Sequence, residues 1–371
     1  MEVFKRSLIN LAGWKSRRRF LCIESDDWGA VRMASTGAFE TLLGKGYNLQ
    51  ECAYSRYDTL ETPDALGDLM DVLSNIRDAN GGCAKITLNM IMANPNFDAI
   101  KRGRFEEYHY EPFWETLSHQ SGPEVISAYR EARSAGVAFP QLHGREHIAA
   151  ARWLAALRNG HPEFIDAFRE GVYALAMGTR ESGSRDHLDA LGFTPEDTEF
   201  SEVVESLRDA QRLFKTFWGE KAEAFIPPCY VWHPAIERGL SEIGIRFIQG
   251  TRVQRIPRAN GEGRLRKRYH FTGQNNSLGQ TYLVRNVELE PSLTGDETRV
   301  IDTALAQVRS AFRLNTPAIV SSHRLNYIGG LSPANRTRGL RVLRRFLKGV
   351  CREWPEIEFI DSASLGRMIE A

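Results

Sequence analysis

The sequence has few cysteines, no long apolar run and almost no net charge. Its five cysteines are odd in number, widely spread along 371 residues and never arranged as Cys-x-x-Cys. This argues against a disulfide framework and against a structural zinc knuckle. No run of about 18 apolar residues is present to span a membrane, and the first 20 residues lack the apolar segment of a secretory signal. We therefore expect a cytoplasmic protein with reduced thiols and no membrane span.

The charge balance excludes several classes of partner. With 48 basic and 47 acidic residues, the formal net charge is +1, so there is no overall attraction to nucleic acid or to an anionic membrane. Two short basic stretches, residues 15–19 and 264–268, are typical of solvated surface. A hydrophobic content of 42% is enough for a sizeable core. The composition predicts a globular protein without a nucleic-acid partner, and it leaves the oligomeric state open.

Short apolar runs alternate with long amphipathic stretches, which is typical of βα units around a parallel sheet or barrel. No repeat or linker divides the chain, so we expect one elaborated α/β domain over residues 1–371, with insertions at about 94–121 and 158–193. Cap residues followed by proline predict helix starts at Thr62-Pro63, Thr194-Pro195 and Ser332-Pro333. Seven strands are predicted, over residues 20–25, 84–92, 137–142, 224–226, 246–249, 318–322 and 358–360.

The first expected insertion is rich in aromatic residues. Rings in a long loop above a barrel could form a wall for stacking sugars, or they could pack the insertion onto the barrel. The sequence leaves both open for Phe97, Phe105, Tyr108, Tyr110, Phe113 and Trp114.

Two adjacent carboxylates, Asp26 and Asp27, follow the first predicted strand. Like charges this close are unfavourable unless one is protonated or held by a cation. The pair therefore suggests one carboxylate on a metal and its neighbour free for acid/base chemistry. A solvated turn with an Asp cap is the alternative.

Two histidines, His143 and His147, follow the third predicted strand. A spacing of four residues places both side chains on one face of a starting helix, where they can reach one divalent cation. A chance pair is the alternative, because the chain has nine histidines. Together with Asp27 they would form an open three-ligand site, as expected of catalytic zinc. Nickel, cobalt or manganese would satisfy the same ligands.

Two further strand ends carry residues suited to chemistry. Pro227-Pro228 fixes the backbone where a strand meets a loop, which would hold the next N–H groups toward a pocket. His323 ends the sixth predicted strand and titrates in a range suited to proton transfer. Taken singly, a proline pair is more often a turn, and such a histidine more often a hydrogen-bonded strand-end residue.

Taken in order along the chain, these motifs resemble those of the polysaccharide deacetylase family, the divalent-metal amidases of carbohydrate esterase family four. The resemblance covers the strand skeleton from about residue 20 to residue 360 and is poor in the insertions. It is specific as a set and weak motif by motif. It implies a distorted (β/α)7 barrel that removes N-acetyl, sometimes O-acetyl, groups from chitin-like oligosaccharides, peptidoglycan or exopolysaccharide. The matching residues are Asp26-Asp27, His143 with His147, Pro227-Pro228 with Tyr230, and His323.

The resemblance also implies a role for each matching residue. Asp26 would be the general base and His323 the general acid that protonates the leaving amine or alkoxide. One divalent ion, most simply zinc, would be held by Asp27, His143 and His147. A backbone N–H near Cys229 or Tyr230 would help to stabilise the oxyanion, and Trp28 and Arg324 complete the set of expected substrate contacts.

The chain departs from the family pattern at three positions. Trp28 stands where the family has a glycine, and Cys229 stands where it has a tyrosine directly after the prolines. Ile226 replaces the arginine that usually precedes the prolines and orients the base. Either Arg324 or Arg145 could replace that arginine in space.

Three functions fit these observations. The first is a metal-dependent deacetylase acting on an acetylated carbohydrate, and a cytoplasmic location would favour a small, nucleotide-linked or lipid-linked substrate. The second is a carbohydrate-binding or scaffolding protein that keeps the barrel without turnover. The third is a glycoside hydrolase on a similar barrel that uses carboxylates such as Asp26 and Glu24 as its acid/base pair.

Overall fold

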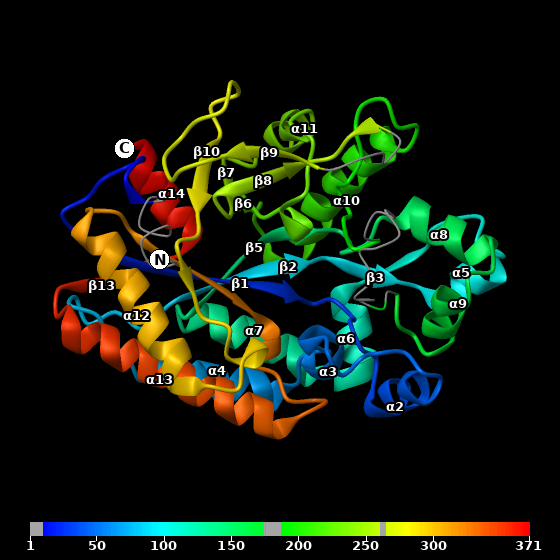
Figure 1. Ribbon diagram of the computed structural model, residues 1–371, viewed down its shortest axis with the longest axis horizontal. Coiled ribbons are helices and arrows are strands. Elements are labelled where there is room, and N and C mark those ends of the chain that lie inside the picture. The colour runs from blue at the N-terminus through cyan, green and yellow to red at the C-terminus, as the bar shows by residue number, and fades with distance from the viewer. Residues whose placement is uncertain (1–9, 174, 176–186, 260–264) are drawn as a thin grey trace.

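A parallel sheet curled around the centre of the molecule dominates the computed structural model, which describes residues 10–173, 175, 187–259 and 265–371 (Figure 1). Along the sheet the strand order is β10-β7-β6-β5-β2-β1-β12-β11. The strands are β1 (Arg19–Trp28), β2 (Ile86–Ile91), β5 (Ala138–Gly144), β6 (Ala224–Phe225), β7 (Phe247–Gly250), β10 (Thr281–Val284), β11 (Val287–Glu288) and β12 (Ala318–His323).

One chain segment, residues 281–289, closes this sheet into a barrel. Its first half, β10, pairs with β7, and its second half, β11, pairs with β12 on the opposite edge. Between the two halves, Arg285 N–H donates to Gly250 O at 2.8 Å and Asn286 N–H donates to Ile319 O at 3.0 Å. The segment is thus the seventh strand, or stave, of the barrel, and its two halves pair with different neighbours. The fold is a distorted (β/α)7 barrel, as expected.

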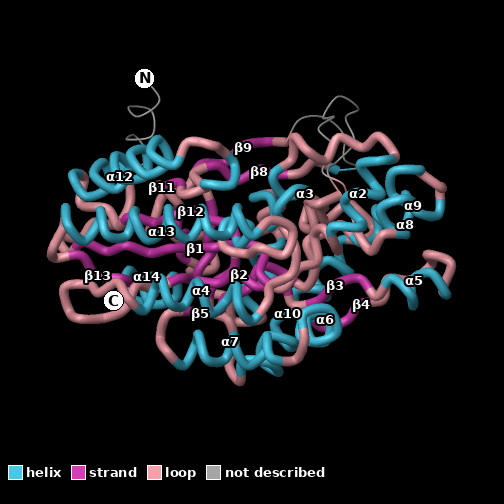
Figure 2. The backbone as a smooth tube through the Cα atoms, turned by 90° about the horizontal axis from the view of Figure 1, so that it is seen from below, coloured by secondary structure: helices cyan, strands magenta, loops and turns pink. Residues whose placement is uncertain are grey.

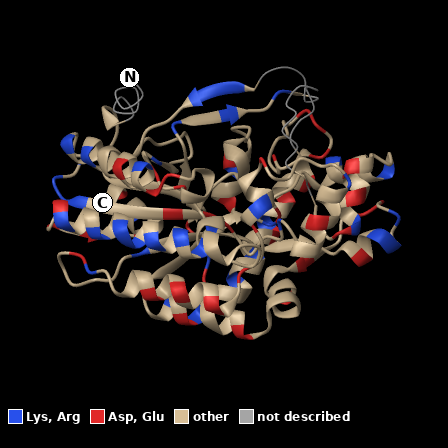
Figure 3. Ribbon diagram, turned by 60° about the horizontal axis from the view of Figure 1, so that its bottom comes forward, with Lys and Arg blue, Asp and Glu red and all other residues tan. Residues whose placement is uncertain are grey.

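All seven predicted strands are present; six of them form the barrel, and the seventh lies beside it. Residues 358–360 contribute to β13 (Ile357–Phe359), which pairs only with the first residues of β1. The true seventh stave was not predicted. Two antiparallel ribbons were also not predicted, β3 (Ala93–Pro95) with β4 (Tyr110–Pro112) and β8 (Val253–Ile256) with β9 (Arg266–Tyr269). The basic residues of β9 lie at the surface (Figure 3).

Helices surround the barrel, and α12, α13 and α4 lie along one side (Figure 2). Two predicted starts are confirmed, because Thr62 caps α4 and Ser332 caps α13 through their hydroxyl groups. The Thr194-Pro195 start is wrong: Thr194 N–H donates to the Asp197 carboxylate in a turn, and α10 begins at Phe200. The helices are α2 (Thr36–Gly44), α3 (Ala53–Tyr57), α4 (Pro63–Ser74), α5 (Phe97–Arg102), α6 (Phe113–Ser121), α7 (Glu124–Ser134), α8 (Ala150–Arg158), α9 (Pro162–Arg169), α10 (Phe200–Trp218), α11 (Ile236–Glu242), α12 (Glu297–Arg313), α13 (Pro333–Glu353) and α14 (Ser362–Glu370).

Several aromatic residues of the first insertion pack against the neighbouring helices. Phe97 and Phe105 contact Phe168 of α9 at ring-centroid distances of 5.1 and 5.2 Å, and Trp114 stacks on Phe217 at 5.3 Å. Their burial stabilises the insertion against the helices beside the barrel. Part of the second insertion, residues 174 and 176–186, lies outside the described residues.

Side chains inside the barrel form two layers. Alternate residues of a strand face the same side. From β1, apolar Phe20 and Cys22 enter the lower layer, nearer the amino ends of the strands, and Glu24 and Asp26 enter the upper layer, nearer the carboxyl ends. The lower layer is sealed by Leu365 of α14. The polar upper layer lies at the carboxyl ends of the strands, where barrel enzymes place their catalytic groups. Within the described ranges, no helix combines the length and the apolar character that crossing a bilayer requires.

Candidate metal and acid/base site

A break in the regular pairing of β1 places both adjacent carboxylates in the site. The β1–β2 register shifts between Ser25 and Trp28, and Asp27 has a φ of 72°. Bulges re-aim side chains, and a left-handed non-glycine residue is strained and concentrates at functional sites. The bulge turns Asp27 toward the barrel rim, while Asp26 keeps facing the interior.

Trp28 does not face the site. Its side chain is buried in the main core, its Nε1–H donates to Ser25 Oγ at 3.0 Å, and its ring meets Tyr129 edge to face. The expectation that Trp28 contacts substrate is therefore wrong, because the bulge directs this side chain into the core.

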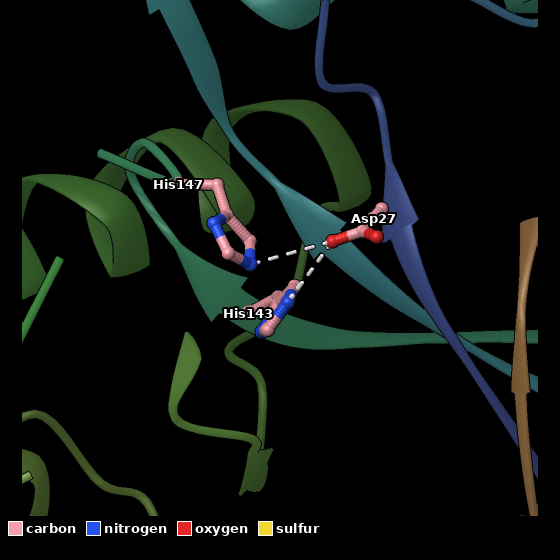
Figure 4. A group of neighbouring side chains, drawn as sticks. All are labelled: Asp27, His143 and His147. Atoms are coloured by element: carbon pink, nitrogen blue, oxygen red, sulfur yellow. Dashed lines mark ion pairs between the residues drawn. The ribbon is translucent and has the colours of Figure 1, made fainter. Parts of the chain in front are cut away.

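Three predicted metal ligands converge at the rim (Figure 4). Oδ1 of Asp27 lies 3.4 Å from Nε2 of His143 and 3.5 Å from Nε2 of His147. Two ligand atoms on a tetrahedral zinc ion, each about 2.0–2.2 Å from the metal, lie roughly 3.3–3.6 Å apart. All three residues are buried, and the group can hold one divalent metal ion.

The protonation states of this group suit metal binding. Nδ1–H of His143 donates to Ile226 O at 2.8 Å, which leaves Nε2 with a free lone pair toward the group, as in metal sites where a backbone carbonyl orients the imidazole. Burial lowers the pKa of His147 to about 4, so its imidazole is neutral at neutral pH. Burial alone would raise the pKa of Asp27, but the surrounding histidines, the charged His323 among them, hold it well below its ordinary value. An ionised carboxylate and a neutral imidazole are ready ligands.

Asp26 is held by an arginine that the sequence analysis did not identify. Arg285, in the gap between β10 and β11, donates from Nη2 to Oδ1 of Asp26 at 2.6 Å and from Nη1 to Oδ2 at 2.7 Å. Asn89 adds a hydrogen bond to Oδ1 at 2.8 Å. Burial alone would raise the pKa of Asp26, but Arg285, together with His323 and His143, lowers it to about 2. Asp26 is therefore ionised and fixed in orientation.

Neither Arg324 nor Arg145, the two arginines expected to orient Asp26, does so. Arg324 is fully buried and donates to Asp58 and to Glu61, each at 2.8 Å, so it contacts neither Asp26 nor a ligand in the site. Arg145 pairs with Glu146 and Asp209. Both expectations are wrong, because each guanidinium is engaged by other groups, which for Arg324 include the Ala30 carbonyl.

His323 sits opposite the metal group and is charged. Its Nδ1 lies 2.6 Å from Oε1 of Glu290, and its Nε2 lies 3.2 Å from the Tyr54 hydroxyl and 3.7 Å from Oδ2 of Asp26. Burial alone would lower the pKa of His323, but Glu290 and the two aspartates raise it to about 10. At neutral pH the side chain is an imidazolium, as a proton donor requires.

The turn after β6 is strained where the resemblance placed the oxyanion donors. Cys229 and Tyr230 have φ values of 53° and 58°, in the left-handed region that non-glycine residues rarely adopt. Tyr230 N–H is engaged by Pro227 O at 3.0 Å, and the Tyr230 hydroxyl accepts from Arg285 at 3.2 Å. Tyr230 therefore reaches the site through its side chain.

A cavity of about 420 Å³ reaches the site at His323 and Arg285. Its lining also includes Ser321, Arg252 and Leu293, but neither Asp26 nor any of the three ligand residues. This volume lies within the range of small-molecule sites.

Short sequence signals could have revealed Arg285 and Glu290. The apolar run Tyr282-Leu283-Val284 directly precedes Arg285, and Leu289 precedes Glu290. Each is the pattern of a short strand followed by a polar strand-end residue. Tyr54 had no such signal, because it lies on a five-residue helix between two loops.

No family model and no curated protein matches the chain. Several solved structures resemble it at low sequence identity. A 4-alpha-glucanotransferase from Thermococcus litoralis aligns with 94% of this chain at 10% identity and a TM-score of 0.45, and this chain spans only 40% of it. A protein from Mycobacterium smegmatis that is taken to be a polysaccharide deacetylase aligns over 97% of this chain and 93% of its own, at 11% identity and a TM-score of 0.46. A peptidoglycan deacetylase from Bacillus subtilis aligns over 95% of this chain and 92% of its own, at 7% identity and a TM-score of 0.40.

Proposed function

We propose that this protein is a metal-dependent hydrolase that removes acetyl groups, chiefly N-acetyl groups, from a carbohydrate. The observation that carries the proposal is the meeting of Asp27, His143 and His147 at one rim of the barrel, beside an ionised Asp26 and a protonated His323. An ionised carboxylate beside a protonated imidazole is the combination that general acid–base hydrolysis uses.

Each residue would act at a defined atom. A divalent ion bound to Asp27, His143 and His147 would supply Lewis-acid activation of the acetyl carbonyl and of water. Asp26, oriented by Arg285, would accept the proton of the attacking water. His323, charged because of Glu290, would supply the proton for the leaving nitrogen or oxygen.

The geometry disfavours glycoside hydrolysis by Glu24 and Asp26. Glu24 is fully buried, its Oε2 accepts from Arg285 at 2.6 Å and its Oε1 accepts from Ser362 at 2.8 Å. A carboxylate closed off in this way cannot reach a glycosidic oxygen. The third function therefore lacks its acid/base pair.

Acetate release from a panel of acetylated sugars, with and without a chelator, tests the proposal. We expect release that chelation abolishes and that His143→Ala lowers by at least about 100-fold, the scale of losing a group required for catalysis. His119→Ala is the matched control, since this exposed histidine lies on α6, outside the ligand group. Wild-type protein that is loaded with zinc and releases no acetate from any member of the panel would contradict the proposal, and binding of glycan without turnover would favour the scaffolding alternative.

A further inference from the structure

Tyr54 occupies the position from which His323 would protonate a leaving group. Its hydroxyl lies 3.2 Å from Nε2 of His323, and its ring meets the imidazole edge to face at 5.3 Å. Nδ1 of His323 faces Glu290. Since an imidazolium donates from both nitrogens, the charged His323 donates to Glu290 through Nδ1 and to Tyr54 through Nε2.

No other group in the described part of the chain competes well for this proton. Oδ2 of Asp26, at 3.7 Å from Nε2, is beyond hydrogen-bonding distance. A leaving atom must therefore either displace the Tyr54 hydroxyl from His323 or take its proton from that hydroxyl.

The structure opposes displacement, because Tyr54 is clamped to the end of β12. The Tyr54 carbonyl accepts from Asp58 N–H at 3.0 Å, and the Asp58 carboxylate accepts from Arg324 Nε at 2.8 Å. Arg324 directly follows His323 in the chain. The Arg32 guanidinium also lies over the Tyr54 ring, 5.5 Å from its centroid. The first two contacts fix the backbone at Tyr54, and the contacts of its ring with Arg32 and His323 oppose rotation of the side chain away from His323.

We propose that Tyr54 relays the proton of the general acid, so that its hydroxyl is the group that touches the leaving atom of the substrate. As the acyl bond to the sugar breaks, the leaving nitrogen or oxygen takes the Tyr54 proton, and the Tyr54 oxygen takes the proton from Nε2 of His323. His323 becomes neutral and keeps its Nδ1 proton, which stays hydrogen-bonded to Glu290. The proton that Asp26 removed from water then restores His323, so one water is consumed for each acetate released. This inference rests on the proposed function and makes Tyr54 a catalytic residue of it.

The test compares Tyr54→Phe with Tyr57→Phe on two substrates. Phenylalanine keeps the ring packing and removes only the hydroxyl, and Tyr57 lies at the other end of α3. An N-acetyl sugar needs its leaving amine protonated, whereas 4-nitrophenyl acetate releases a stable phenolate without help. We expect Tyr54→Phe to lower kcat on the N-acetyl sugar by about 100-fold or more, the usual scale of general acid catalysis, and to change kcat on 4-nitrophenyl acetate by less than about threefold. Tyr57→Phe should match the wild type on both.

Two results would overturn the relay. An unchanged kcat on the N-acetyl sugar would mean that His323 donates directly, and equal losses on both substrates would mean that Tyr54 only supports the structure. Nitrogen NMR of His323 gives a readout independent of activity, because the Nε2–H resonance should shift in Tyr54→Phe and stay in place in Tyr57→Phe. If the wild type hydrolyses neither substrate, the proposed function fails and the relay with it, while the NMR shift still reports whether the hydrogen bond exists.

Discussion

Replacing Arg285 with methionine should destabilise the protein far more than the loss of a surface arginine. Arg285 is 1% exposed and donates to Glu24 at 2.6 Å and to both oxygens of Asp26. Its removal leaves two carboxylates in the barrel without their cation. Breaking a buried ion pair by removing one partner costs about 3–5 kcal/mol. Arg246→Met is the control, because this arginine is 48% exposed and pairs with Glu223 at 2.9 Å, a pair worth about 0–1 kcal/mol.

The pH dependence of this difference identifies Asp26 as the group responsible. The folded-state pKa of Asp26 is depressed to about 2, below its unfolded value of about 3.9. A depressed carboxyl pKa contributes stability that is present above the unfolded pKa and is lost as pH falls through the folded one. Without Arg285, burial raises the folded pKa of Asp26, so the gap between wild type and Arg285→Met should be full above that raised pKa and should narrow as pH falls from it toward about 2.

Urea unfolding followed by tryptophan fluorescence measures these free energies. Adding Glu24→Gln to Arg285→Met removes one stranded charge, so the double variant should recover about 1–3 kcal/mol relative to the sum of the single variants. A loss of less than about 1 kcal/mol in Arg285→Met, equal to that of a surface ion pair, would refute the claim that Arg285 is the essential partner of Asp26 and Glu24.

Three further predictions follow from contacts around the site. Glu290→Gln should lower the pKa of His323 by roughly 1–3 units and move the alkaline limb of kcat/KM toward neutral pH, and an unmoved limb would exclude Glu290 as the source of the charge. His143→Ala should abolish stoichiometric zinc in elemental analysis while His119→Ala keeps it, and zinc retained by both would assign the metal elsewhere. Trp28→Phe should cost about 1–2 kcal/mol through its lost hydrogen bond to Ser25 and leave zinc binding intact, whereas loss of zinc would mean that the bulge depends on this ring.

The site was predictable from sequence where a strong strand signal precedes a polar residue. Asp26-Asp27 and His143 follow apolar runs long enough to be identified as buried strands, and parallel strands bring their carboxyl ends to one rim. Their meeting is therefore a consequence of topology, which the alternation of strands and helices already indicates.

Arg285 and the seventh stave were not predictable in the same way. The stave is split into four and two residues that pair with different neighbours, so neither half gives a strong strand signal. Its arginine reaches Asp26 only after the barrel has closed, across 259 positions of sequence. The same holds for Trp28, whose burial depends on the bulge at Asp27 and not on its own neighbours in sequence. Such details arise from tertiary packing, which overrides local pattern.

Crystals soaked in zinc and measured on both sides of the zinc absorption edge would test the central claim most directly. We predict a single anomalous peak within about 2.0–2.2 Å of Oδ1 of Asp27, Nε2 of His143 and Nε2 of His147. A peak away from these three atoms, or none at full soaking concentration, would contradict the account.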